Sequence, residues 1–123
     1  MHRPATLHYV IARTADDAVI GGVTLETDYR TGTLKLRIAP SLPDADALRA
    51  AALRILHPWL RDDLELMTFV LHIPADQPET IVAAEALEMA LAVRLREAIM
   101  RPDHRVDELI YQALLTPWAV RDA

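Results

Sequence analysis

The residues best placed for ligand chemistry lie at positions 41–47, between an expected strand and an expected helix. The first backbone N–H groups of a helix have no partner within the helix, and its N-terminus carries partial positive charge. A strand that leads through a short loop into a helix is therefore a common site for anionic ligands. Here the segment contains Asp44 and Asp46, whose carboxylates stabilise a helix start but would repel a bound phosphate.

A histidine and an aspartate four positions apart, His72 and Asp76, form a second candidate site. This His-x-x-x-Asp spacing is found in acyltransferases several times longer than this chain, so the simpler interpretation is that His72 ends a strand. The other histidines lack the spacing of a metal site; they are His2, His8, His57 and His104. Among the basic residues of the expected strands, Arg37 is a candidate contact for a ligand phosphate.

Length and composition narrow the classes of function. The chain has 123 residues, which suits one domain with a substantial core. Lys and Arg number 13 against 18 Asp and Glu, which gives a net charge of −5 and disfavours nucleic acid or an anionic membrane as partner. There is no cysteine, which excludes disulfides and thiolate metal sites. No long apolar run or signal-peptide pattern is visible, so we expect a cytoplasmic location.

Three strands begin the expected fold. Residues 34–38 alternate apolar with basic side chains, which is the period of a half-buried strand. Runs with high strand propensity at residues 6–13 and 19–26 precede it on short connections, so the three strands form an antiparallel meander. Gly21 and Gly22 mark a bulge or the close approach of another strand.

A helix with one apolar face is expected at residues 44–60. Residues 66–73 then form a nearly continuous apolar run, which suits a central strand that pairs in parallel with the strand before the helix. A second helix should begin with Asp76 as its cap and Pro78 in its first turn. Glu79 would complete a capping box.

Helix propensity alone would extend the second helix over residues 77–100. From Leu91, however, apolar residues recur at every second position, so we place a break near residue 88 and a strand at residues 90–98. A last strand at residues 106–115 completes the order β-β-β-α-β-α-β-β. The expected fold class is α+β, with a mixed, mostly antiparallel sheet and two helices in a single domain.

This order and several motifs resemble the GCN5-related N-acetyltransferase (GNAT) superfamily, especially its ribosomal-protein N-acetyltransferase-like branch. Residues 76–89 are similar to the pattern Asn-x-x-Ser, an apolar pair, then Glu-x-Leu-Gly-Phe or Met, with Gln77, Thr80 and Glu88 in place of Asn, Ser and Gly. The resemblance covers about residues 6–118. It also includes a later group of residues: Leu95-Arg96-Glu97, Asp107, Tyr111 and Trp118.

The resemblance implies transfer of an acetyl group from acetyl-CoA to an amine. It places acetyl-CoA in a splayed gap between the two parallel strands, with the pyrophosphate on the following loop. It also implies a general base, for which Glu26 is the candidate, and an acid for the leaving thiolate, for which Tyr111 is the candidate. The residues expected to contact acetyl-CoA are Ile38, Ala39, Asp44, Ala45, Asp46, Ala47, Gln77 and Thr80.

Two departures from the family pattern leave another function open. The loop has no glycine, and Pro43 has no N–H, so the backbone cannot easily curl around a pyrophosphate. The chain also begins at what would be the family's second strand, without the usual first strand and two helices. The alternative is a non-catalytic module of this fold that dimerises, binds a partner, or holds a different acyl or nucleotide ligand in the same gap.

We expect a homodimer. The strand at residues 6–13 would present an unpaired edge, and one side of the sheet would be uncovered. A two-fold contact would cover both features. Trp118 is a candidate anchor for an interface. The competing arrangement is that the tail, residues 116–123, folds back over the gap.

Overall fold

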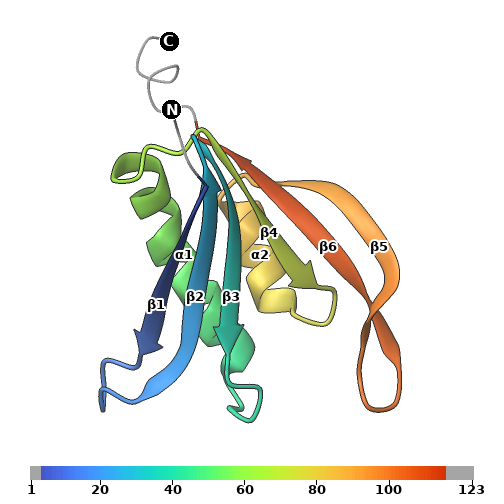
Figure 1. The fold of residues 1–123 in the computed structure, drawn as a ribbon. Coiled ribbons are helices and arrows are strands. Elements are labelled where there is room, and N and C mark those ends of the chain that lie inside the picture. Colours follow the sequence, from blue (N-terminus) through green and yellow to red (C-terminus); the bar gives the residue numbers. More distant parts are fainter. Residues whose placement is uncertain (1–3, 116–123) are drawn as a thin grey trace.

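The computed structural model describes residues 4–115, and these form one mixed six-stranded sheet with two helices on the same face (Figure 1). The sheet order is β1-β2-β3-β4-β6-β5, and every neighbouring pair is antiparallel except β3 and β4. The predicted element order and fold class are therefore confirmed. The elements are β1 (Ala5–Ala12), β2 (Val19–Asp28), β3 (Thr31–Ile38), α1 (Ala45–Asp62), β4 (Thr68–Pro74), α2 (Pro78–Ala86), β5 (Ala90–Met100) and β6 (Arg105–Leu114).

Alternation along the strands divides the sheet into two faces. Leu25, Leu34 and Leu71 occupy neighbouring register positions on the face that the helices cover, and all three are buried. The opposite face, which we call the open face, carries the residues between them, such as Glu26 and Lys35. The hydrophobic core thus lies between the sheet and the two helices, and polar chemistry on the sheet is confined to the open face.

The helices are held against the sheet by small and aliphatic residues. Helix α1 buries Ala50, Leu53 and Leu60 along one stripe, as the helical spacing predicts. Helix α2 is short and buries Ala83 and Ala84, which lets it approach the sheet closely. None of the helices among residues 4–115 is both long and apolar enough to cross a membrane.

The predicted break after α2 is confirmed, since β5 begins at Ala90. The chain turns at Glu88, which has a φ of 62°. The predicted capping box is wrong. Gln77 precedes α2 in the capping position without a side-chain bond, and Asp76 pairs with Arg101 instead. Pro78 does occupy the first turn, as expected.

The expectation of a close approach at the glycine pair is confirmed at Gly21. A Cβ there would lie 2.0 Å from the carbonyl oxygen of Arg37 on β3, so no larger residue fits without a backbone shift. The ladder between β1 and β2 is also irregular nearby, at Ile11 and Ala12. This packing fixes the course of β3 just before its carboxyl end.

Candidate functional site

The site begins where the two parallel strands separate. The ladder between β3 and β4 runs from Thr31↔Thr68 to Leu34↔Leu71 and ends there. Strand β3 nevertheless continues to Ile38, and β4 continues to Pro74. Backbone groups that face the neighbouring strand beyond Leu34 and Leu71 therefore have no ladder partner, and a ligand could bond to them. The carboxyl ends of parallel strands are a common ligand position in sheets with helical crossovers.

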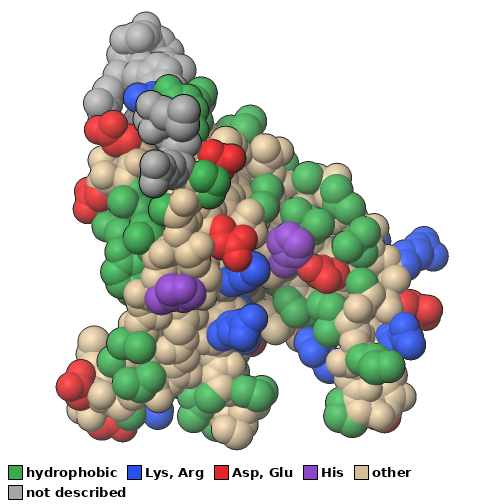
Figure 2. Space-filling view, viewed as in Figure 1, with side chains coloured by type: hydrophobic (Ala, Val, Ile, Leu, Met, Phe, Trp, Pro, Cys, Tyr) green, Lys and Arg blue, Asp and Glu red, His purple; other side chains and the backbone are tan. Residues whose placement is uncertain are grey.

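Two pairs of polar side chains flank this gap on the open face. Lys35 and His72 are the first residues beyond the ladder on β3 and β4. The Lys35 Nζ lies 3.1 Å from the Glu26 Oε1, and the His72 Nδ1 contacts the Glu108 Oε1 on β6. Figure 2 looks onto this face and shows histidine, acidic and basic side chains gathered near its centre, with apolar side chains over β5 and β6.

Below the gap, the loop after β3 leads into α1 through two tight turns. The Leu42 N–H donates to the Ala39 carbonyl at 3.1 Å, and the Ala45 N–H donates to the Leu42 carbonyl at 3.2 Å. Asp44 occupies the capping position of α1, but its side chain makes no capping hydrogen bond. The start of this 18-residue helix therefore lacks a side-chain cap and keeps its capacity to bind an anion.

Asp46, in the first turn of α1, is bonded to the start of α2. Its carboxylate accepts hydrogen bonds from the Glu79 N–H at 2.8 Å, the Thr80 N–H at 3.1 Å and the Thr80 hydroxyl at 2.5 Å. Thr80 is fully buried. Asp46 thus caps the second helix from the first, and its charge is directed at the N-terminus of α2. Of the two carboxylates expected to oppose a pyrophosphate, that of Asp46 is thus bonded to α2, whereas that of Asp44 makes no capping hydrogen bond among residues 4–115.

Several solved structures share this arrangement of strands and helices. A protein from Sphaerobacter thermophilus DSM 20745, whose name gives acetyltransferase as a provisional function, is 47% identical and superposes with a TM-score of 0.86. The match covers 90% of this chain and 66% of that one. The chain has the GNAT fold. No family model and no curated protein sequence matches it.

Two further GNAT structures share the fold at lower identity. The spermidine/spermine N-acetyltransferase SpeG from Vibrio cholerae is 19% identical with a TM-score of 0.71, over 97% of this chain and 72% of that one. The ribosomal-protein-S18-alanine N-acetyltransferase from Escherichia coli is also 19% identical with a TM-score of 0.71, over 90% of this chain and 70% of that one.

The GNAT fold separates the two residues that we assigned to acid–base chemistry. Glu26 lies on the open face in its ion pair with Lys35. Tyr111 lies on the helix-covered face, where it is 4% exposed within the core. Burial raises the pKa of Tyr111, with a smaller contribution in the same direction from Glu85. The two side chains therefore face opposite sides of the sheet.

Of the residues expected to contact acetyl-CoA, hydrogen bonds between the two helix starts bring Asp46 and Thr80 together. Ile38 ends β3 and Ala39 follows it, Asp44 precedes α1, which begins at Ala45, and Gln77 precedes α2, whose first turn contains Thr80. The Gln77 Oε1 is buried and has no hydrogen-bond partner among residues 4–115. A buried acceptor without a donor is costly, so this atom fits a ligand that brings an amide or hydroxyl donor.

A cavity of about 310 Å³ lies beside this group, between the two helices. Its lining is Ala47, Ala50, Arg54, Pro78, Glu79 and Val82. Ala47 follows Asp46 on α1, and Pro78 precedes Glu79 on α2. The cavity therefore lies next to the hydrogen bonds that join the first turns of the two helices. A second hollow of about 440 Å³ lies on the open face, between Glu26 and Gln112.

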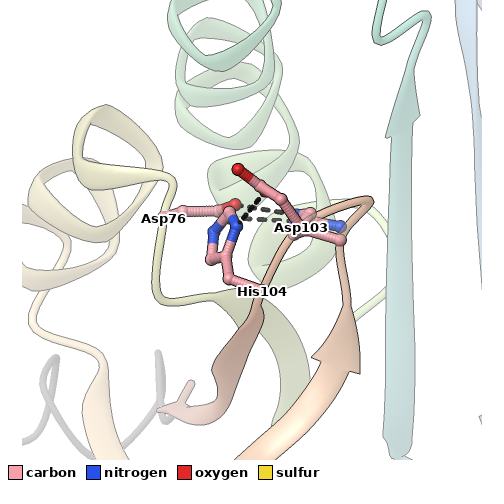
Figure 3. A network of polar contacts seen from close by, with 4 residues as sticks. Asp76, Asp103 and His104 are labelled. Atoms are coloured by element: carbon pink, nitrogen blue, oxygen red, sulfur yellow. Dashed lines mark hydrogen bonds and ion pairs between the residues drawn. The ribbon is translucent and has the colours of Figure 1, made fainter.

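The turn between β5 and β6 reaches the same end of the molecule (Figure 3). The Arg101 guanidinium bonds to both carboxylate oxygens of Asp76, at 2.7 and 3.0 Å, and Asp103 contacts His104 beside it. Arg101 holds the pKa of Asp76 below its usual range. Nearby, burial lowers the pKa of Arg49, against the opposing charges of Asp46 and Asp76. Residues 4–115 contain no group of three or more potential metal ligands.

Sequence reasoning missed two features of this site. It set His72 aside as the end of a strand, and it gave Asp46 no partner. The partners are distant in sequence, at Glu108 and Thr80, and only the sheet register and the helix packing bring them close. Strand parity could have placed His72 on the open face, because Leu71 and Ile73 on either side of it are apolar.

Proposed function

We propose that the chain transfers an acetyl group from acetyl-CoA to an amine. The observation that supports this most directly is the gap between β3 and β4, where the ladder ends at Leu34↔Leu71 while both strands continue. The resemblance to the 47% identical structure supports the same reaction class. The chain spans 66% of the length of that protein, so the activity of the whole protein is carried over here only as a proposal.

The described residues fit acetyl-CoA along a continuous path. The backbone groups of Ile38 that face the gap and the Gln77 Oε1 offer partners for the amides of the pantetheine arm, whereas the Ala39 N–H and carbonyl are already bonded to Ile20 and Leu42. The N–H groups of Asp46 and Ala47, which follow the Ala45 N–H that is bonded to Leu42, offer partners for the pyrophosphate. Thr80 serves differently in this proposal: its hydroxyl is already bonded to Asp46 and fully buried, so it positions the helix start.

The reaction is balanced without an additional reactant. Acetyl-CoA supplies an acyl group activated as a thioester. The neutral amine attacks the carbonyl carbon, a C–N bond forms, and the C–S bond breaks. A protonated amine loses one proton to a base before attack, and a second proton passes from nitrogen to the departing sulfur. Backbone N–H groups of the unpaired edge of β3 are suited to stabilise the negative oxygen of the intermediate.

The first test is a thermal melt with and without acetyl-CoA. A ligand present at 100 times its dissociation constant adds about 2.7 kcal/mol of stability, so the melting temperature should rise by several degrees. Release of the CoA thiol is then followed with a thiol reagent in the presence of candidate amines. The neighbours suggest two acceptors, spermidine and a peptide with an N-terminal alanine.

A non-catalytic module of the same fold is the second candidate. The observation that favours it is the loop 39–44, which has no glycine and contains Pro43. In this case acetyl-CoA produces no rise in melting temperature and no thiol release, although the protein is folded. A melt with CoA and other nucleotides then tests whether the gap holds a different ligand.

We also propose a homodimer, with β5 as its contact. This edge strand is exposed along almost its whole length, and it carries Leu91, Val93 and Leu95 at 45%, 43% and 42% exposure. Such an apolar edge is uncommon on a soluble monomer. Register shifts interrupt its ladder with β6 at two places, so contact through side chains suits it better than edge pairing. The expected anchor, Trp118, lies outside the described residues.

Sedimentation equilibrium at micromolar concentration tests the dimer. We expect a mass of two chains for the natural protein and of one chain for Leu95→Arg. Val10→Arg is the matched control, because Val10 is 72% exposed on β1, the opposite edge strand. Dissociation by Val10→Arg with no effect of Leu95→Arg would move the contact to β1, and one chain in all three proteins would refute the dimer.

A further inference from the structure

His72 lies at the mouth of the gap, on the side from which an amine can approach. It is the first residue of β4 beyond the ladder with β3. Its neighbours Leu71 and Ile73 are buried against the helices, so the His72 side chain points to the open face. It is 45% exposed there. An imidazole in this position is both close to the gap and accessible to a second substrate.

Glu108 orients the His72 ring. The His72 Nδ1 contacts the Glu108 Oε1, and Glu108 is largely shielded, with 22% of its side chain exposed. An ionised carboxylate can only accept hydrogen bonds, so Nδ1 carries the proton in the neutral ring. The Nε2 lone pair is then free to accept a proton. Both residues lie on central strands that are paired with each other, which fixes their separation.

The other charged groups on this face leave His72 as the available base. Glu26 on β2 is already engaged in an ion pair with the Lys35 ammonium on β3 at 3.1 Å. Arg37 is further along β3. On the other side, β5 places Val93 and Leu95 opposite Ile110 and Glu108, so no charged residue of β5 competes for His72 at these positions.

We infer that His72 is the catalytic base that takes the proton from the attacking amine, and that Glu108 is its positioning residue. This rests on the proposed acetyl transfer. The ammonium form of the acceptor gives one proton to the His72 Nε2, the free amine attacks the thioester, and the imidazolium returns that proton to solvent after the product leaves. Histidine suits this step because its charge changes within the physiological pH range.

The kinetic test compares His72→Gln with Glu108→Gln and the control His8→Gln. His8 is also a histidine of the open face, but it lies on β1, at the far edge of the sheet. We expect His72→Gln to lower kcat/KM by about 10²–10⁴-fold and to abolish the acid limb of the pH profile. The KM for acetyl-CoA and the melting temperature should change little. Glu108→Gln should lower kcat less, with the KM for acetyl-CoA unchanged, because the His72 ring loses the acceptor that fixes its orientation.

A purely structural role for the pair predicts a different result. Both variants would then melt earlier, and the pH profile would keep its shape. Retention of the acid limb in His72→Gln, with kcat/KM within threefold of the natural protein, overturns the assignment. So does an equal loss in His8→Gln.

Binding provides a readout that does not depend on turnover. Acetyl-CoA is titrated into the protein while the histidine ring resonances are followed by NMR, with His72 assigned from the spectrum of His72→Gln. We expect the His72 signal to move and the His8 signal to stay. If acetyl-CoA binds and the His72 signal is unchanged, the base assignment fails while the proposed function stands. If acetyl-CoA does not bind, or binds without transfer to either acceptor, the proposed function and the base assignment both fail.

Discussion

Replacing Asp46 with alanine tests the link between the two helices. The change removes three hydrogen bonds, from the Glu79 N–H, the Thr80 N–H and the Thr80 hydroxyl. Loss of a side-chain helix cap costs about 0.5–2 kcal/mol. Thr80 is fully buried, and in the variant its N–H has lost its partner while its hydroxyl keeps only the 3.4 Å contact to the carbonyl of residue 46, which costs roughly 1–3 kcal/mol more. We therefore expect Asp46→Ala to lower the free energy of unfolding by roughly 2–4 kcal/mol.

Urea denaturation followed by circular dichroism measures this loss directly, and a thermal melt should show a decrease of roughly 6–20 °C. Asp44→Ala is the matched control. It removes the same charge two positions earlier, where the side chain makes no capping hydrogen bond, and should cost less than about 1 kcal/mol. Asp46→Asn should fall between the two. If Asp46→Ala is within 0.5 kcal/mol of the natural protein, or if Asp44→Ala costs as much, the cross-helix cap does not contribute as described.

Three further predictions concern the gap, the core and the sheet. Asp44→Gly removes a carboxylate that makes no capping hydrogen bond at the start of α1, so it should tighten acetyl-CoA binding severalfold by calorimetry. Unchanged affinity would contradict the charge argument. Burial, followed by the charge of Arg61, lowers the pKa of His57 from 6.5, so the folded state resists its protonation and stability should fall as the pH drops below about 6.5. In His57→Gln, melting temperatures at pH 5 and pH 7.5 should differ less than in the natural protein, and an equal difference would exclude His57. Tyr111→Phe should keep thiol release within twofold, because the hydroxyl faces the core, whereas a loss above tenfold would restore Tyr111 as the acid.

The elements were predictable because their signals are local. Alternation over residues 34–38 and the one-sided apolar stripe of α1 each arise from neighbours in sequence, and both appear as expected. The break after α2 was also readable, from the spacing of the apolar residues that follow Leu91. The residue type at position 88 is the unusual feature of this break, since Glu88 adopts a φ of 62° without being glycine or asparagine.

The site was less predictable because its contacts join distant segments. Asp46 meets Thr80 across 34 positions, and His72 meets Glu108 across 36. Each contact depends on strand register or helix packing. Neither can be recognised from the type of any single residue in the sequence. The capping rule predicted Asp76 as the cap of α2, and this was wrong. Asp76 pairs with Arg101 on the β5–β6 turn, and Asp46 on α1 provides the cap.

The Asp46 link also has a consequence for how the gap behaves. Strands β3 and β4 diverge, yet the helices that follow them are fastened together at their first turns. The hydrogen bonds between the helix starts therefore fix the width of the gap, and the ligand does not set it. Because such a gap is preorganised, ligand binding orders few residues and costs little conformational entropy. Association with such a site is expected to proceed in a single kinetic step, without a slow phase of closure.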